Sequence, residues 1–273
     1  MQKVVESGTD PGNMMREFAE WFEDQLSGLG RYTLLCAETA LAMVTQRLSF
    51  SDLLYQLHFI GVKSQAVVVI TGAFTGMVLC AQTFFQFHKV KMDTATLAVV
   101  SVSMGSELGP VLTGLMVAGR VGAAMAAELG TMRVTEQIDA LRTLATHPVD
   151  YLVVPRVLAT LLALPLLTAE SIAIGIAAGY AVGVGLLGID SAYAWHNMLR
   201  YTYVEDIIIG LLKSVVFAAI LATVSCYKGM NCREGAEGVG RATTEAVVAS
   251  SITVLMSNFF LTMFLNRLIY GYD

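Results

Sequence analysis

Long apolar stretches separated by short polar ones dominate the sequence. A bilayer core of about 30 Å requires roughly 20 apolar residues of α-helix. Five stretches reach that length with at most one charge each: residues 64–87, 94–119, 157–189, 207–227 and 246–266. The third would extend about 50 Å at 1.5 Å per residue, so we expect one helix bent near Pro165 rather than two spans. The pattern predicts an all-α integral membrane protein with five transmembrane helices.

The pattern before the first span is different. One helical face there carries Met14, Met15, Phe18, Trp21, Phe22, Leu26 and Leu29. Residues 1–30 are therefore expected to form an amphipathic cytoplasmic or interfacial segment, and residues 31–273 the membrane domain. The apolar stretch 32–48 contains Glu38 and is short for a span, so an interfacial helix is favoured over a sixth crossing. A second amphipathic piece, with Phe50, Leu53, Leu54 and Leu57, follows it.

Residues 126–141, AAELGTMRVTEQIDAL, have the pattern of a soluble helix between the second and third spans. Its polar positions are Arg133, Glu136, Gln137 and Asp139. Its apolar positions are Val134, Ile138 and Leu141, and Ala145 continues this spacing after the stretch. Spacings of three and four residues place the apolar side chains on one helical face. The pattern predicts an amphipathic helix whose apolar face contacts another surface.

Composition and charge support the membrane assignment and give its orientation. Charged residues are 14% of the chain, against about 25% in soluble domains. Twelve lysines and arginines fall on the side of the N-terminus and four on the other, so the N-terminus is expected to be cytoplasmic and the C-terminus to lie on the opposite face. The sequence has no basic arm of the kind that would indicate binding to nucleic acid. Because no cleavable secretory signal is apparent, insertion is expected to rely on the internal spans.

The sequence carries no motif for catalysis. It has no P-loop, no H-E-x-x-H and no G-x-S-x-G pattern. The four cysteines form no C-x-x-C pair, and the four histidines are scattered over four segments, so no metal site is expected. The chain is therefore predicted to be non-catalytic. If it moves a substrate uphill, the energy has to come from an ion gradient or from another subunit.

Ionisable residues inside spans are costly and indicate functional sites. Glu107 lies in S-M-G-S-E-L-G-P near the centre of the second span, next to Pro110. A proline removes a backbone hydrogen bond, so the helix can open there and line a polar cavity. Lys213, in the fourth span, is the natural partner of Glu107. A static buried ion pair explains these two residues about as well as a substrate site does.

Two further patterns concern packing and helix ends. The ridges formed by Gly72 with Gly76 and by Gly175, Gly179 and Gly183 predict close helix packing. G-A-E-G-V-G-R-A-T-T at 235–244 predicts a flexible cytoplasmic turn, with Thr243 or Thr244 capping the last span.

Four sequence blocks together resemble one known family. They are ELGPVLTGLMVAGRVGAAMAAELGTMRVTEQIDAL (107–141), HPVDYLVVPRVLA (147–159), LLKSVVF (211–217) and GVGRATTEAVVASS (238–251). They are similar to the MlaE/YrbE permeases, the membrane subunits of lipid-transporting ABC systems that work with MCE proteins. The resemblance runs from about residue 31 to the C-terminus. It implies an interfacial helix followed by five spans, with residues 31–273 as the permease domain.

The resemblance also implies partners and a location. It implies a homodimer in the bacterial inner membrane, with the N-terminus cytoplasmic and the C-terminus periplasmic. It further implies a separate ABC ATPase that binds ATP and Mg²⁺, a periplasmic MCE-domain protein and, in some systems, a small STAS-domain protein, while the chain itself binds no cofactor. The cargo would be phospholipid, moved for outer-membrane lipid homeostasis and asymmetry. The helix after the second span would be the coupling helix that docks on the ATPase through Arg133, Val134, Glu136, Ile138, Asp139 and Leu141.

The resemblance implies a lipid pocket near Glu107, Leu108, Lys213 and Asp206. Two positions depart from relatives. The residue before E-L-G-P is often Arg in relatives and is Ser106 here, which leaves Lys213 as the nearest cation for an anionic headgroup. Asn258 stands where some relatives carry a carboxylate.

Two other functions are compatible with the residues. A secondary transporter driven by an ion gradient would use Glu107 as its titrating group, although the five spans show no obvious inverted repeat. A non-transporting membrane scaffold would need neither Glu107 nor Lys213.

Overall fold

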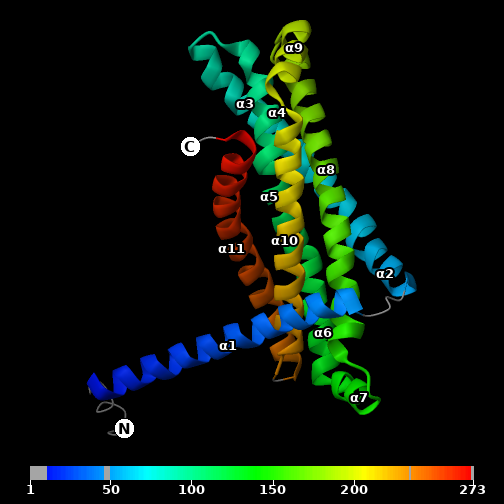
Figure 1. The fold of residues 1–273 in the computed structure, drawn as a ribbon. Coiled ribbons are helices and arrows are strands. Elements are labelled where there is room, and N and C mark those ends of the chain that lie inside the picture. Colours follow the sequence, from blue (N-terminus) through cyan, green and yellow to red (C-terminus); the bar gives the residue numbers. More distant parts are fainter. Residues whose placement is uncertain (1–10, 46–49, 234, 272–273) are drawn as a thin grey trace.

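The computed structural model describes residues 11–45, 50–233 and 235–271, and all regular structure in these ranges is helical. Figure 1 shows an elongated bundle with α7 at one end and α9 at the other. Five helical stretches in the described ranges are long and apolar enough to cross a membrane: Phe50–Lys89, Asp93–Val134, Val149–Gly185, Val204–Met230 and Gly235–Tyr270. The predicted number and order of spans are confirmed.

Several spans consist of more than one helical segment. The first contains α2 (Phe50–Leu57), η1 (His58–Val62) and α3 (Lys63–Lys89). The second contains η2 (Asp93–Ala95), α4 (Thr96–Ser103), η3 (Met104–Leu108), α5 (Gly109–Val117), η4 (Ala118–Gly122) and α6 (Ala123–Val134). The third contains η5 (Val149–Val153) and α8 (Val154–Gly185), and the last two are α10 (Val204–Met230) and α11 (Gly235–Tyr270). Two short helices, α7 (Gln137–Thr143) and α9 (Ser191–Tyr201), lie between spans.

Two predicted boundaries are wrong. The amphipathic piece 50–57 is continuous with the first span, because α2 continues through η1 into α3. The segment 235–244 is not a turn, since α11 begins at Gly235. Thr243 donates its hydroxyl hydrogen to the carbonyl of Val239 at 2.6 Å, inside the helix, so it does not cap the helix. Both helical stretches begin before their apolar segments, so limits set by apolar length place these starts too late.

The N-terminal helix α1 (Pro11–Thr45) lies across the α7 end of the bundle and is not among the spans (Figure 1). The predicted boundary between residues 30 and 31 falls inside this continuous helix. Leu26 and Leu29 are exposed. The side chains of the other residues in the predicted apolar face (Met14, Met15, Phe18, Trp21 and Phe22) are outside those that the structure describes.

Two tyrosines attach α1 to α10. The hydroxyls of Tyr32 and Thr223 are 2.8 Å apart, and the Tyr227 hydroxyl donates to the carbonyl of Gly28 at 3.0 Å. The rings of Tyr32 and Tyr227 meet edge to face, with centroids 5.5 Å apart. Burial raises the pKa of Tyr32 from 10.0 to about 12, because the ionised phenolate loses its hydration there.

Helices α3 and α8 pack closely, and the two predicted glycine ridges face each other in this pair. A Cβ atom at Gly76 would overlap the backbone of Gly175, and one at Gly72 would lie 2.8 Å from the Ser171 hydroxyl. The absence of side chains lets the two backbones touch. Pro165 lies inside α8, which is one helix as expected.

Candidate functional site

Proline opens the backbone of the second span beside Glu107. Pro110 has no N–H group, so it cannot donate to the carbonyl of Ser106 four residues earlier. Residues Met104–Leu108 form the π-helical turn η3, which widens the helix at this point. The Ser106 carbonyl accepts a hydrogen bond from the ammonium of Lys213 at 3.1 Å instead. The proline thus leaves a backbone acceptor for a side chain of another span.

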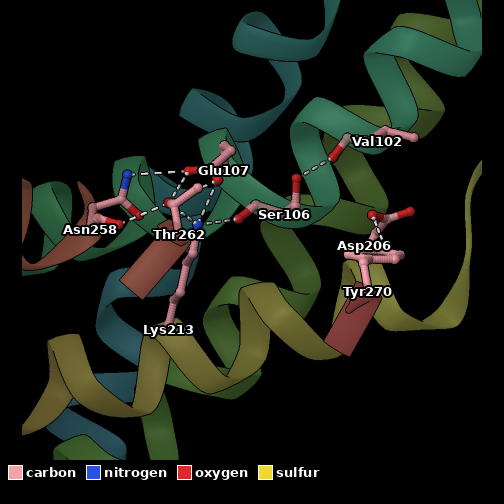
Figure 2. Close-up of polar contacts among 8 residues, drawn as sticks. All are labelled: Val102, Ser106, Glu107, Asp206, Lys213, Asn258, Thr262 and Tyr270. Atoms are coloured by element: carbon pink, nitrogen blue, oxygen red, sulfur yellow. Dashed lines mark hydrogen bonds and ion pairs between the residues drawn. The ribbon is translucent and has the colours of Figure 1, made fainter. Parts of the chain in front are cut away.

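Lys213 is completely buried on α10 and uses all of its donors (Figure 2). In addition to the Ser106 carbonyl, its ammonium lies 2.7 Å from Glu107 Oε1 and 2.8 Å from Thr262 Oγ1. An ammonium has three N–H donors, and the three contacts account for them. The predicted partnership of Glu107 and Lys213 is confirmed.

Two residues of α11 complete the cluster around Glu107, as Figure 2 shows. Asn258 Nδ2 donates to Glu107 Oε2 at 3.1 Å, and the Thr262 hydroxyl lies 3.0 Å from Oε1. Thr262 was not predicted, although it follows Asn258 by four residues and therefore lies on the same helical face. The cluster joins the second, fourth and fifth spans. It holds one carboxylate and one ammonium, so its formal charge is zero.

The cluster lies within the membrane-spanning part, nearer the α9 end. Lys213 follows Val204 by nine residues and precedes Met230 by seventeen, or about 14 Å and 26 Å along α10. The side chain of Glu107 retains 34% of its surface exposed, whereas that of Lys213 retains none. The carboxylate is therefore the charged group of the pair that an approaching molecule can reach.

A mostly apolar pocket of about 500 Å³ lies toward the α9 end of the second span. It is lined by Met92, Thr94, Ala95, Ala98, Val99, Val102, Ser103, Asn197 and Tyr201, from the start of the second span and from α9. Ser103, which lines the pocket, precedes Glu107 by four residues, or about 6 Å along the span. The pocket and the polar cluster thus lie about one helical turn apart along the second span.

Leu108 and Asp206, the other two predicted pocket residues, have different surroundings. Leu108 is half-buried and packs against a core that includes Leu97 and Met104. Asp206 accepts hydrogen bonds from the Tyr270 hydroxyl at 2.6 Å and from the backbone N–H of Tyr203 at 3.0 Å. Figure 2 shows this pair apart from the Glu107 cluster. The contacts of Asp206 attach the end of α11 to the start of α10.

The predicted helix over residues 126–141 is interrupted, which corrects the sequence interpretation. The second span ends with α6 at Val134, and α7 begins at Gln137. Between them Glu136 has a left-handed backbone conformation, with φ of 59°. The chain turns at this residue. The periodicity of the segment therefore comes from the end of one helix and the start of another.

The apolar side of α7 packs on the chain itself. Ile138 is 1% exposed, in a core with Leu129 and Val153, and Leu141 packs against the same core. Hence Ile138 is not available to a partner. Arg133 donates to both oxygens of Asp139 at 2.8 Å, an ion pair that joins α6 to α7.

A different set of side chains is available at this end of the molecule. Val134 and Glu136 are exposed at the turn, and Leu144, directly after α7, is 74% exposed. A pocket of about 440 Å³ opens next to them, lined by Glu38, Arg142, Ala145, Thr146, His147, Pro148, Val149 and Met230. Leu144 is the more exposed of the two apolar side chains Val134 and Leu144, and the sequence pattern did not single it out.

The fold and the site define a multi-pass, all-α membrane protein with a polar cluster inside its spans. Residues 53–264, which include the whole cluster, match the family model described as Permease MlaE. The chain belongs to the MlaE permease family.

Named relatives cover most of the chain. A probable ABC transporter permease protein of Rickettsia bellii is 44% identical over 86% of this chain and 90% of its own length. The intermembrane phospholipid transport system permease protein MlaE of Haemophilus influenzae is 36% identical over 88% of this chain and 92% of its own. The chloroplastic protein TRIGALACTOSYLDIACYLGLYCEROL 1 of Arabidopsis thaliana is 35% identical over 90% of this chain and 71% of its own.

Proposed function

We propose that this chain is the non-catalytic transmembrane subunit of an ABC transporter that moves phospholipid between the bacterial inner membrane and a periplasmic MCE protein. The transport would contribute to the lipid homeostasis and asymmetry of the outer membrane. Membership of the permease family and the phospholipid transport named for the Haemophilus influenzae relative support this proposal.

The observation that carries the proposal is the juxtaposition at Glu107. The carboxylate of Glu107 is accessible inside a span, and the mostly apolar pocket that Ser103 lines begins about one helical turn away along the same span. A phospholipid has the same two parts, a polar headgroup and apolar acyl chains. Intramembrane ionisable residues commonly mark substrate pathways. The cluster also lies nearer the α9 end, which suits exchange with a periplasmic protein there.

The two ends of the bundle suit different partners. An ATPase that binds ATP and Mg²⁺ would dock at the α7 end, on Glu136, Leu144 and the adjacent pocket. The MCE protein would contact the α9 end, and a small STAS-domain protein would bind the ATPase. This arrangement requires the α7 end and the N-terminus to be cytoplasmic and the C-terminus periplasmic, as the distribution of Lys and Arg indicates.

A homodimer is proposed through α11, the least buried of the spans. Its outer surface exposes Ile252, Leu255, Met256, Phe259, Phe260, Met263 and Phe264. The same helix supplies Asn258 and Thr262 to the cluster, so a second copy would bring two clusters close to one interface.

The source of energy provides the test. Lipid transfer from vesicles that contain the assembled complex to purified MCE protein is expected to require ATP and to stop with an ATPase variant that cannot hydrolyse it. An uncoupler of ion gradients should leave transfer unchanged. Transfer that continues without ATP and stops with the uncoupler would instead establish the gradient-driven carrier with Glu107 as its titrating group.

A further inference from the structure

The cluster around Glu107 differs in what its two charged groups can offer a ligand: the donors of Lys213 are already used, whereas Glu107 can still accept a hydrogen bond. Each N–H of Lys213 is donated within the protein, to the Ser106 carbonyl, Glu107 and Thr262, and the side chain is fully buried. A phosphate that approached the cluster would find no free N–H on this ammonium. The expectation that Lys213 balances an anionic headgroup is therefore not supported by its contacts.

Glu107 offers the complementary chemistry. About a third of its side chain is exposed, and a carboxylate only accepts hydrogen bonds. Its Oε2 atom receives one hydrogen bond from Asn258 at 3.1 Å and a longer contact from Thr262 at 3.4 Å. The Thr262 hydroxyl has a single hydrogen and lies closer to the Asn258 carbonyl at 2.8 Å and to Oε1 at 3.0 Å, so one lone pair of Oε2 can accept a further donor. A charged donor binds a carboxylate more strongly than a neutral one.

Arg120 and Arg267, two other cations on the spans that form the cluster, are poorly placed to neutralise a phosphate at Glu107. Arg120, the next cation along the second span, lies thirteen residues after Glu107, or about 20 Å along the helix. It donates to the Ser64 hydroxyl and lies over the ring of Phe59. Arg267 follows Thr262 by five residues on α11, which places it about 140° around that helix.

We infer that the site selects lipids whose headgroup carries a primary ammonium, with the ammonium donating to the Glu107 carboxylate. Zwitterionic aminophospholipids satisfy this requirement. Headgroups that carry only negative charge place a phosphate against a carboxylate, and a quaternary ammonium has no N–H to donate. The inference rests on the proposed function and specifies its substrate class.

The test is lipid competition in a bilayer of defined composition. The purified complex is placed in nanodiscs that contain equal amounts of phosphatidylethanolamine, phosphatidylcholine and phosphatidylglycerol with identical acyl chains. Tightly bound lipid is then identified by native mass spectrometry. Wild-type protein is expected to retain about ten times more phosphatidylethanolamine than phosphatidylglycerol. This is the ratio that one charge-assisted hydrogen bond to the headgroup would produce. Bound lipid with no such preference, or with phosphatidylglycerol favoured, overturns the inference and leaves the proposed function intact. No bound lipid overturns both.

Variants separate headgroup charge from shape. Glu107→Gln is expected to abolish the preference, because the amide is neutral. Ser106→Arg adds a guanidinium beside the carboxylate and should shift binding toward phosphatidylglycerol, whereas Ser106→Met adds similar length without charge and should not. Arg267→Gln is the control for a cation on another face and should leave the preference unchanged. A preference that depends on Arg267 and not on Glu107 contradicts the inference.

Discussion

The ammonium of Lys213 lies 2.7 Å from Glu107, and the two side chains differ in exposure: Lys213 has none, while Glu107 retains about a third. Removing the charge of Glu107 and removing the charge of Lys213 therefore have different consequences for stability. Without Glu107, a cation is left buried among helices with neutral partners only. Without Lys213, a carboxylate is left that water or lipid still reaches.

We predict that Glu107→Gln destabilises the protein more than Lys213→Met does. Leaving a buried charge unpaired costs about 3 kcal/mol or more, and replacing both partners by neutral groups is often nearly neutral. The double variant Glu107→Gln/Lys213→Met should therefore be more stable than Glu107→Gln alone. Thermal unfolding of the four proteins in one detergent measures this. A double variant with the summed loss of both single variants would show that the pair is not coupled.

The contact between α1 and α10 predicts a pH dependence. Tyr32→Phe removes the hydrogen bond to Thr223 and should cost about 1 kcal/mol at pH 8. The folded-state pKa of Tyr32 is about 12 against 10.0 when unperturbed, so the folded protein holds this proton more tightly. Its stabilising effect is complete below pH 10 and is lost as the pH rises toward 12. The difference in Tm between wild type and Tyr32→Phe should shrink over that interval.

The control for Tyr32 is Tyr55→Phe, because Tyr55 is 69% exposed. It should change Tm little at any pH in this range. A constant difference between wild type and Tyr32→Phe from pH 8 to pH 12 would contradict the assigned pKa.

The exposed tip after α7 predicts where the ATPase binds. Leu144→Asp should weaken co-purification of the ATPase by about tenfold or more, the loss typical of an interface hot spot, with no change in Tm. Leu186→Asp is the matched control, since Leu186 is 81% exposed near the other end of α8. Ile138→Asp is expected to lower Tm instead, because Ile138 is in the core. Unchanged co-purification with Leu144→Asp would exclude this tip as the docking surface.

The contact between α3 and α8 predicts a strict requirement at Gly76. Gly76→Ala places a methyl group against the backbone of Gly175, so the helices have to move apart and Tm should fall clearly. Gly119→Ala, in the second span, meets no atom within 4 Å and should be neutral or stabilising by up to about 1 kcal/mol. Equal effects of the two substitutions would mean that close packing does not limit this helix pair.

The sequence predicts the spans and the central ion pair well, for a clear physical reason. Apolar length and the cost of buried charge are local properties, and Glu107 with Lys213 is a natural pairing of opposite charges inside spans. The partner of an amphipathic face is not a local property. The pattern of α7 identifies Ile138 as apolar, but only tertiary structure shows that the chain buries it against Leu129.

Backbone conformation accounts for the places where helix boundaries in the structure differ from those predicted from the sequence. The turn at Glu136 needs a left-handed conformation that no glycine or proline marks. The start of α11 at Gly235 lies in a stretch whose glycines favour a turn, yet the helix forms there. Its Glu245 side chain accepts hydrogen bonds from Lys228 at 2.9 Å and from Arg241 at 3.0 Å. Asp206 was implied as a pocket residue only by the family resemblance, and its contact with Tyr270 connects residues 64 positions apart.

Native mass spectrometry of the complex, released gently from its native membrane, tests the central claim most directly. The proposed function predicts two copies of this chain with two ATPase subunits, an oligomer of MCE protein and bound phospholipid. A lone chain or dimer without ATPase under several mild detergents would contradict it.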